Sequence, residues 1–184
     1  MSTRLILLAH GAVGLMREGG FPHPQAPLDA SGRAKATATG WRGPRPRRAF
    51  HGTETASLET AALLGLDASP AAPLSDAGHG AWAGRAFAEI EAEALAAWLA
   101  DPAAGTPGGE PLEAVRQRVG DWMDAQAAQD GTAAAVVSAT VVRAAVAHVL
   151  GVAAAATLRI DVAPLSVAEF SFNRVWRLQR LGDV

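Results

Sequence analysis

The stretch Arg4-Leu5-Ile6-Leu7-Leu8-Ala9-His10-Gly11 decides the fold. From Leu5 to Ala9 it is apolar without alternation, which is typical of a strand that is covered on both faces within a parallel sheet. The apolar run stops at His10 and Gly11. We therefore predict a central strand over residues 4–9 that ends in a polar loop.

Segments with strand and helix character alternate along the rest of the chain. Asp29 or Ser31 can cap a helix that continues to about Trp41. The remaining predicted strands are 49–52, 72–77 and 132–138, and the remaining predicted helices are 54–64, 87–99, 111–128 and 141–150. Residues 166–172 and 175–181 alternate apolar and polar side chains around Asn173-Arg174, which indicates an antiparallel hairpin. The whole chain, 1–184, is therefore expected to be one α/β domain. We predict a three-layer α/β/α sandwich whose mainly parallel sheet carries the antiparallel hairpin at its C-terminal edge.

The composition argues against several classes of protein. A length of 184 residues suits one domain, and the lack of cysteine excludes a disulfide framework, a cysteine nucleophile and a thiolate metal site. The formal charge of −2 gives no basic field for nucleic acid, and no apolar run reaches the ~18 residues of a membrane span. We expect a cytoplasmic protein without a nucleic-acid or membrane partner.

Two predicted strand ends are the expected location of a ligand site. Ligands of open α/β sheets collect at the carboxyl ends of the strands. His10 and Gly11 follow the first strand, and Ser138 ends the strand over 132–138. If these strands are neighbours, residues 10 and 138 face each other across one pocket. A histidine before a glycine at a strand end is also compatible with an ordinary turn, so the other motifs of the chain decide between the two readings.

Six sets of short motifs follow one another in a fixed order. They are Leu7-Leu-Ala-His-Gly11 with 27–29 and 32–34, then Thr60-Ala-Ala-Leu-Leu-Gly-Leu66, Gly80-Ala-Trp-Ala-Gly-Arg85 with 89–90, Gly108-Gly-Glu-Pro-Leu112, Val141-Val-Arg-Ala-Ala145 and Ala163-Pro-Leu-Ser-Val167. In this order and spacing the chain resembles the histidine phosphatase superfamily, the phosphoglycerate-mutase-like proteins, over essentially its whole length.

The resemblance implies phosphoryl chemistry. In that family a histidine attacks a phosphomonoester, two arginines and a second histidine hold the phosphoryl oxygens, and a carboxylic acid protonates the leaving alcohol. His10 falls on the nucleophile and Asp76 on the acid, one carbon shorter than the usual glutamate. Positioning and charge neutralisation supply most of such catalysis. His10 and Asp76 are therefore the expected catalytic residues.

The residues that would clamp phosphate depart from the family pattern. Ala9 and Ala56 fall on the two arginines, and Ser138 falls on the second histidine. Removing one preorganised donor commonly costs ~10²–10³ in rate, so three absent donors imply a loss of at least roughly 10⁴ even with strong non-additivity. Ser138 can donate one neutral hydrogen bond but brings no charge.

Nearby cations could replace the clamp. Arg17 and His79 are the first candidates, and His51, Arg48 and Arg143 are further ones. For each of them a surface or structural role is the plainer interpretation. Gly11, beside the nucleophile, and Trp82, in the glycine-rich loop, complete the expected lining of the pocket. Asp76 and His79 have no histidine or carboxylate cluster around them, so we expect no metal and no other cofactor.

The sequence leaves three hypotheses open. The first is a phosphatase fold whose pocket has lost its clamp and now binds an uncharged or weakly anionic small molecule, or a protein partner. The second is an active phosphomonoesterase that acts through a phosphohistidine at His10 on a small phosphorylated metabolite, as in the cobalamin-pathway-like and broad-specificity phosphatases. In the third, His10 and Asp76 serve as acid and base in a reaction without phosphoryl transfer. A homodimer is compatible with all three.

Overall fold

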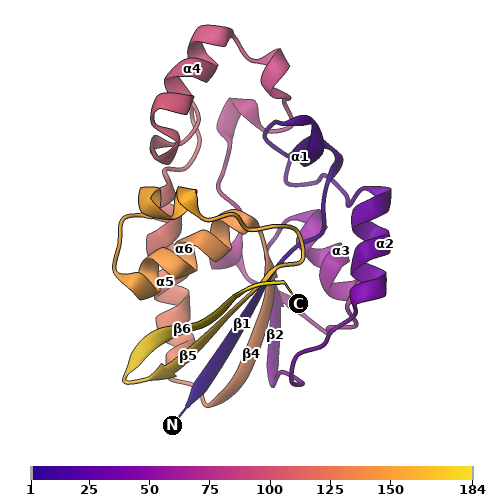
Figure 1. Cartoon of the computed structure of the whole chain (residues 1–184), viewed down its shortest axis with the longest axis vertical. Helices are drawn as coiled ribbons and strands as arrows, with labels where there is room; N and C mark the ends of the chain where they lie inside the picture. Colours follow the sequence, from indigo (N-terminus) through magenta and orange to yellow (C-terminus); the bar gives the residue numbers. More distant parts are fainter. Residues whose placement is uncertain (1, 184) are drawn as a thin grey trace.

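Six strands form one mixed sheet in the computed structural model, which describes residues 2–183 (Figure 1). Their order across the sheet is β3 (Ser69–Pro70), β2 (Arg48–His51), β4 (Gly131–Val137), β1 (Thr3–Ala9), β5 (Val167–Asn173) and β6 (Val175–Gly182). The first four are parallel neighbours, and β5 and β6 run antiparallel at the far edge. This topology confirms the predicted fold class, including the C-terminal hairpin.

Alternate side chains of β1 enter two different cores. Leu5 and Leu7 pack with residues of α5 (Leu112–Ala127) and α6 (Ala139–Leu150) on one face of the sheet. Ile6 and Leu8 pack on the other face with residues of α2 (Ala30–Thr39) and α3 (Thr55–Leu63). All four side chains are buried, because a strand with helices on both sides needs apolar residues at every position. The unbroken apolar run of the sequence is thereby explained.

A lobe stands beyond the carboxyl ends of the parallel strands (Figure 1). It contains α1 (Gly14–Glu18), α4 (Ala92–Ala100) and short 3₁₀ turns at Gly80–Trp82, Phe87–Glu89 and Pro102–Ala104. Phe21 lies at its centre, with ring centroids 5.3 Å from Trp82, 5.3 Å from Phe87 and 4.9 Å from Trp98. These aromatic contacts give the lobe a small core of its own above the sheet.

Two predicted elements are wrong. Residues 72–77 are not a strand: Ala72–Leu74 is a 3₁₀ turn, and the strand that pairs with β2 is the shorter Ser69–Pro70. Pro73 has no N–H to donate to a ladder, and the Ser75 hydroxyl closes the turn on the Ala72 carbonyl at 2.8 Å. The predicted helix over 87–99 divides into a 3₁₀ turn and α4, because the extended backbone at Ile90 turns that side chain into the lobe.

Helix starts follow the capping side chains. Asp29, one of the two predicted caps, accepts a hydrogen bond of 2.6 Å from the Gly32 N–H and starts α2. Ser138 accepts one of 3.2 Å from the Val141 N–H, so α6 begins at residue 139, two residues before the predicted start. A serine at the end of a strand can cap the next helix directly. A separate observation is that, within residues 2–183, no helix has both the length and the apolar character that a membrane crossing requires.

Candidate functional site

The carboxyl ends of β1 and β4 meet, as the sequence predicts. The two strands are parallel neighbours, and the His10 N–H donates to the Val137 carbonyl at 2.8 Å. The next amide, the Gly11 N–H, leaves the sheet and donates to the Thr60 hydroxyl of α3 at 3.0 Å. A Cβ at Gly11 would lie 3.2 Å from the Gly32 carbonyl oxygen, so glycine permits this close approach to α2. His10 is thus held where β1 turns away from the sheet.

One hydrogen bond fixes the tautomer of His10. Its Nδ1 lies 2.7 Å from the Gly11 carbonyl oxygen. Because a carbonyl can only accept, Nδ1 carries the proton and donates it. The lone pair of the neutral ring is then on Nε2. An imidazole held in this way can attack an electrophile or accept a proton through Nε2.

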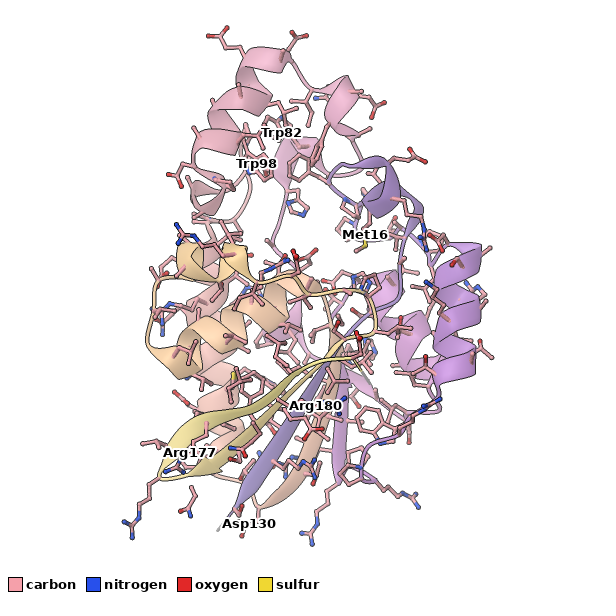
Figure 2. All side chains as sticks on the ribbon, viewed as in Figure 1. Met16, Trp82, Trp98, Asp130, Arg177 and Arg180 are labelled. Carbon is pink, nitrogen blue, oxygen red and sulfur yellow. The ribbon has the colours of Figure 1, made fainter. Side chains whose placement is uncertain are left out.

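A cavity of about 410 Å³ lies over His10, between the strand ends and the lobe. The predicted residues that line it are His10, Ala56, Asp76, His79 and Ser138. Residues 20–24 also line it, and Figure 2 shows Met16, another lining residue, between α1 and the sheet. The strand ends therefore bring five of the predicted site residues to one pocket.

Asp76 is held by neighbours on both sides. Its carboxylate accepts hydrogen bonds from the Ser138 hydroxyl at 2.7 Å and from the Ala77 N–H at 2.8 Å. His79 Nε2 lies 4.0 Å from the other carboxylate oxygen. Since Ser138 also caps α6, the carboxylate and the helix start are fixed together. Asp76 is therefore positioned beside the same strand ends as His10.

Glu54 is a pocket residue that the sequence analysis placed only at the start of a helix. Its side chain lines the cavity, although the residue is only 7% exposed. The carboxylate accepts hydrogen bonds from the Asp76 N–H and, at 3.2 Å, from the Ser57 hydroxyl. Burying a carboxylate requires such donors. The sequence signal that could have identified Glu54 is its position three residues after the end of β2, because ligands collect at the carboxyl ends of parallel strands.

Arg143 is the only lysine or arginine among residues 2–183 that lines this cavity. Its Nε donates to the Ile160 carbonyl at 2.8 Å. Burial lowers the pKa of the Arg143 guanidinium, while the charges of Asp161 and Asp76 act in the opposite direction. One guanidinium and two carboxylates, those of Glu54 and Asp76, therefore line the same cavity.

The other predicted cations lie elsewhere. Arg17 pairs with Asp29 at 2.6 Å, and this contact raises the pKa of Arg17 and lowers that of Asp29. Arg48 reaches toward the carbonyls of Gln129 and Asp130 at the opposite end of the sheet. His51 is buried at the end of β2 and, among the described residues, is not part of the lining. The structure therefore brings His79 and Arg143, but not Arg17, to the pocket.

Ala9 and Trp82 are also outside the lining. Ala9 is 2% exposed and packs within the core on the α5 and α6 side. Trp82 is 5% exposed and packs against Phe21 in the lobe, whereas Trp98 lines the cavity (Figure 2). Gly11 adjoins His10 but contributes its backbone rather than a lining surface. In the described part of the chain, no three histidine or carboxylate side chains come together as a potential metal site.

Comparisons with known proteins agree with the fold. The sequence matches the family profile of the histidine phosphatase superfamily (branch 1) over residues 5–184. None of the curated protein sequences compared with it is similar enough to count as a match.

Several solved structures share the fold. One is a mycobacterial glucosyl-3-phosphoglycerate phosphatase, with a TM-score of 0.85 and 22% identity over 100% of both chains. Another is a putative α-ribazole-5′-phosphate phosphatase of Escherichia coli, with a TM-score of 0.86 and 22% identity over 98% of this chain and 96% of that one. A Thermus thermophilus protein has a TM-score of 0.76 and 25% identity over 98% and 99% of the two chains.

Proposed function

Although the chain belongs to branch 1 of the histidine phosphatase superfamily, we propose that its pocket no longer supports the family reaction at a useful rate. The pocket binds a small molecule that is uncharged or cationic, and it hydrolyses phosphomonoesters at best very slowly. One observation carries this proposal: besides three histidines, the cavity over His10 is lined by two carboxylates and a single guanidinium.

Charge is the physical reason. A phosphomonoester is an anion, and its hydrolysis needs donors and positive charge around the phosphoryl oxygens. Ala9, Ala56 and Ser138 stand where the resemblance places cationic side chains. Glu54 adds a buried negative charge to the same cavity. Each charge-assisted hydrogen bond that is missing removes roughly 1.5–3 kcal/mol of binding to an anion.

The same charges favour other ligands. A primary amine beside Glu54 or Asp76 would gain a charge-assisted hydrogen bond, and a hydroxyl or amide could bond with His79 or Ser138. The lining also contains Phe21 and Trp98, which suit an apolar or aromatic ligand body. An uncharged or cationic molecule therefore fits this pocket better than a phosphate dianion.

Hydrolysis of p-nitrophenyl phosphate tests the proposal. We expect turnover at least roughly 10⁴-fold below that of an active member of the superfamily under the same conditions, because three donors are missing. Turnover within tenfold of that reference would refute it. An independent readout is the binding of orthovanadate. We expect no binding at about 1 mM, a concentration at which even a weak anion site would be partly occupied.

A second candidate function is supported by the hydrogen bond from His10 Nδ1 to Gly11. It leaves Nε2 free to attack phosphorus, with Asp76 nearby as the acid. In this alternative the chain is an active phosphomonoesterase that forms a phosphohistidine. His10→Ala should then abolish hydrolysis, while His51→Ala, which removes a histidine with the same backbone contact outside the pocket, should retain it. Equal residual rates in the two variants would exclude the phosphohistidine route.

A further inference from the structure

A second, smaller cavity adjoins the pocket over His10. Its volume is about 120 Å³, and we call it the apolar annex. It lies between the loop after α4 and the helices α5 and α6, and Val115, Ala144, Ala154 and Leu158 form most of its inner wall. Phe21, Ala77, His79, Trp98, Thr140 and Arg143 line both cavities. The annex is therefore adjacent to the pocket over His10.

Much of the apolar wall of the annex is withdrawn from solvent, although Leu158 is 40% exposed. Val115 has no exposed surface, and Ala144 and Ala154 are each 4% exposed. A fully enclosed apolar cavity of about 150 Å³ in another protein binds benzene, and the annex, although open, has a comparable volume. The annex is of the size that accepts one small ring.

Three of the polar groups around the annex already have partners, whereas Thr140, His79 and Arg143 line the side that the annex shares with the pocket. The Thr106 hydroxyl donates to the His79 carbonyl at 2.7 Å, and the Thr157 hydroxyl donates to the Ala154 carbonyl at 2.8 Å. Glu110 is paired with Arg118 at 2.8 Å. Because these three groups already have hydrogen-bond partners, they do not require a polar group on the bound molecule. Away from the side shared with the pocket, the surface offered to an occupant is thus mainly apolar.

We propose that the apolar annex binds the ring-sized apolar group of the molecule whose polar head lies beside His10 and Asp76. The occupant is an amphipathic small molecule: an aromatic or branched aliphatic group of about six heavy atoms, joined to an uncharged or cationic head. This inference rests on the proposed function for the head and on the annex for the apolar group. Trp98 and Phe21, which line both cavities, would contact the junction of the two parts.

Calorimetric titration with three probes tests the two parts separately. Phenethylamine carries both groups, ethylamine carries only the head, and toluene carries only the ring. Ala144→Leu and Ala154→Leu each fill the annex from a different wall, and Ala97→Leu, on the exposed face of α4, is the matched control. Cooperative thermal unfolding shows that each variant is folded. We expect phenethylamine to bind at least tenfold more tightly than ethylamine, both annex variants to remove that advantage, and the control to retain it.

The outcomes separate the two claims. If phenethylamine binds and folded annex variants keep its full affinity, the annex proposal is overturned while the proposed function stands. If toluene binds and the annex variants abolish this binding, but phenethylamine binds no better than toluene, the annex stands and the cationic head is refuted. No binding of toluene or phenethylamine to the parent protein overturns the annex proposal. Glu54→Gln should weaken the binding of phenethylamine and leave the binding of toluene unchanged. This result would locate the amine head in the pocket.

Discussion

Two histidines of this protein have the same local geometry and different surroundings. His10 directly follows β1 and His51 ends β2, and each directs its Nδ1 to the carbonyl of the glycine that follows, at 2.7 Å and 2.6 Å. Both are secured by β4, because Val137 accepts from the His10 N–H and Val136 accepts from the Gly52 N–H, each at 2.8 Å. Only His10 lines the pocket. A histidine–glycine corner at a strand end is therefore a backbone arrangement, and its surroundings decide whether it can act on a ligand.

The two corners differ in what packs against the glycine. A Cβ on Gly52 would lie 2.3 Å from a Glu54 carboxylate oxygen and 2.7 Å from the Leu74 carbonyl oxygen. At Gly11 the nearest atom would be the flexible end of Leu28, at 3.0 Å. The His51 corner is thus closed tightly by backbone and by Glu54, whereas at the His10 corner the nearest backbone atom, the Gly32 carbonyl oxygen, is 3.2 Å away and only the Leu28 side chain is nearer. This difference indicates that the His51 corner is structural, whereas the His10 corner borders the pocket.

The largest expected effect comes from adding a methyl group to each corner. Gly52→Ala should destabilise the protein by about 3 kcal/mol, because its new Cβ meets backbone that cannot move away. Gly11→Ala should cost about 1 kcal/mol, because the Leu28 side chain can shift. Urea unfolding of the two variants measures the difference. A larger loss for Gly11→Ala would reverse the assignment of the structural and the open corner.

A smaller effect is expected at the hydroxyl that supports the His10 corner. Thr60 is fully buried, accepts from the Gly11 N–H at 3.0 Å and donates to the Ala56 carbonyl at 2.7 Å. Thr60→Val keeps the shape but leaves a buried N–H without a partner, which should cost about 2 kcal/mol. Thr60→Ser keeps the hydroxyl and is the control. Equal unfolding free energies for the two variants would show that this hydrogen bond does not secure the corner.

Much of this arrangement could be predicted from the sequence, because it is local. The apolar run of β1 predicts a doubly covered strand, and the alternation after residue 166 predicts the edge hairpin. His10 and Ser138 could be placed together because neighbouring parallel strands end at the same edge. The strand predicted over 72–77 failed because one proline outweighs a short apolar pattern.

The rest of the pocket depends on long-range packing that no local pattern encodes. Glu54 enters the pocket because the loop that carries Asp76 folds back and donates its amide. Arg17 looked available, but the start of α2 places Asp29 within its reach. Trp98 rather than Trp82 reaches the cavity because both pack around Phe21 in a lobe whose shape is set by tertiary contacts. Residue type was therefore a weaker guide than the position of the backbone.

Ser138 follows β4, the strand that lies between β1 and β2. We expect its substitution to have an intermediate effect. Ser138→Ala removes the cap of α6 and should cost about 1 kcal/mol of stability. Asp29→Ala removes the cap of α2 away from the pocket and should cost a similar amount. Only Ser138→Ala also removes the 2.7 Å hydrogen bond to Asp76, so only it should change binding of phenethylamine. A matching change in binding for Asp29→Ala would contradict this division.

The smallest expected effect concerns the ion pair between Arg118 and Glu110, which holds the loop that carries Asp76. Arg118 donates to the Asp76 carbonyl at 3.1 Å and pairs with Glu110, whose pKa it lowers by hydrogen bonding against the opposing effect of burial. A carboxyl whose pKa is lower in the folded state stabilises the protein above its unfolded pKa of about 4.3, and this contribution is lost as the pH falls through the folded value. Glu110→Gln should therefore cost about 0.5 kcal/mol at pH 7 and nothing near pH 2, because the partly exposed pair is screened by water. Urea unfolding at both pH values, with Glu93→Gln on α4 as the exposed control, measures this difference. A deficit for Glu110→Gln that persists undiminished in acid would mean that its packing, rather than its charge, holds the Asp76 loop against the His51 corner.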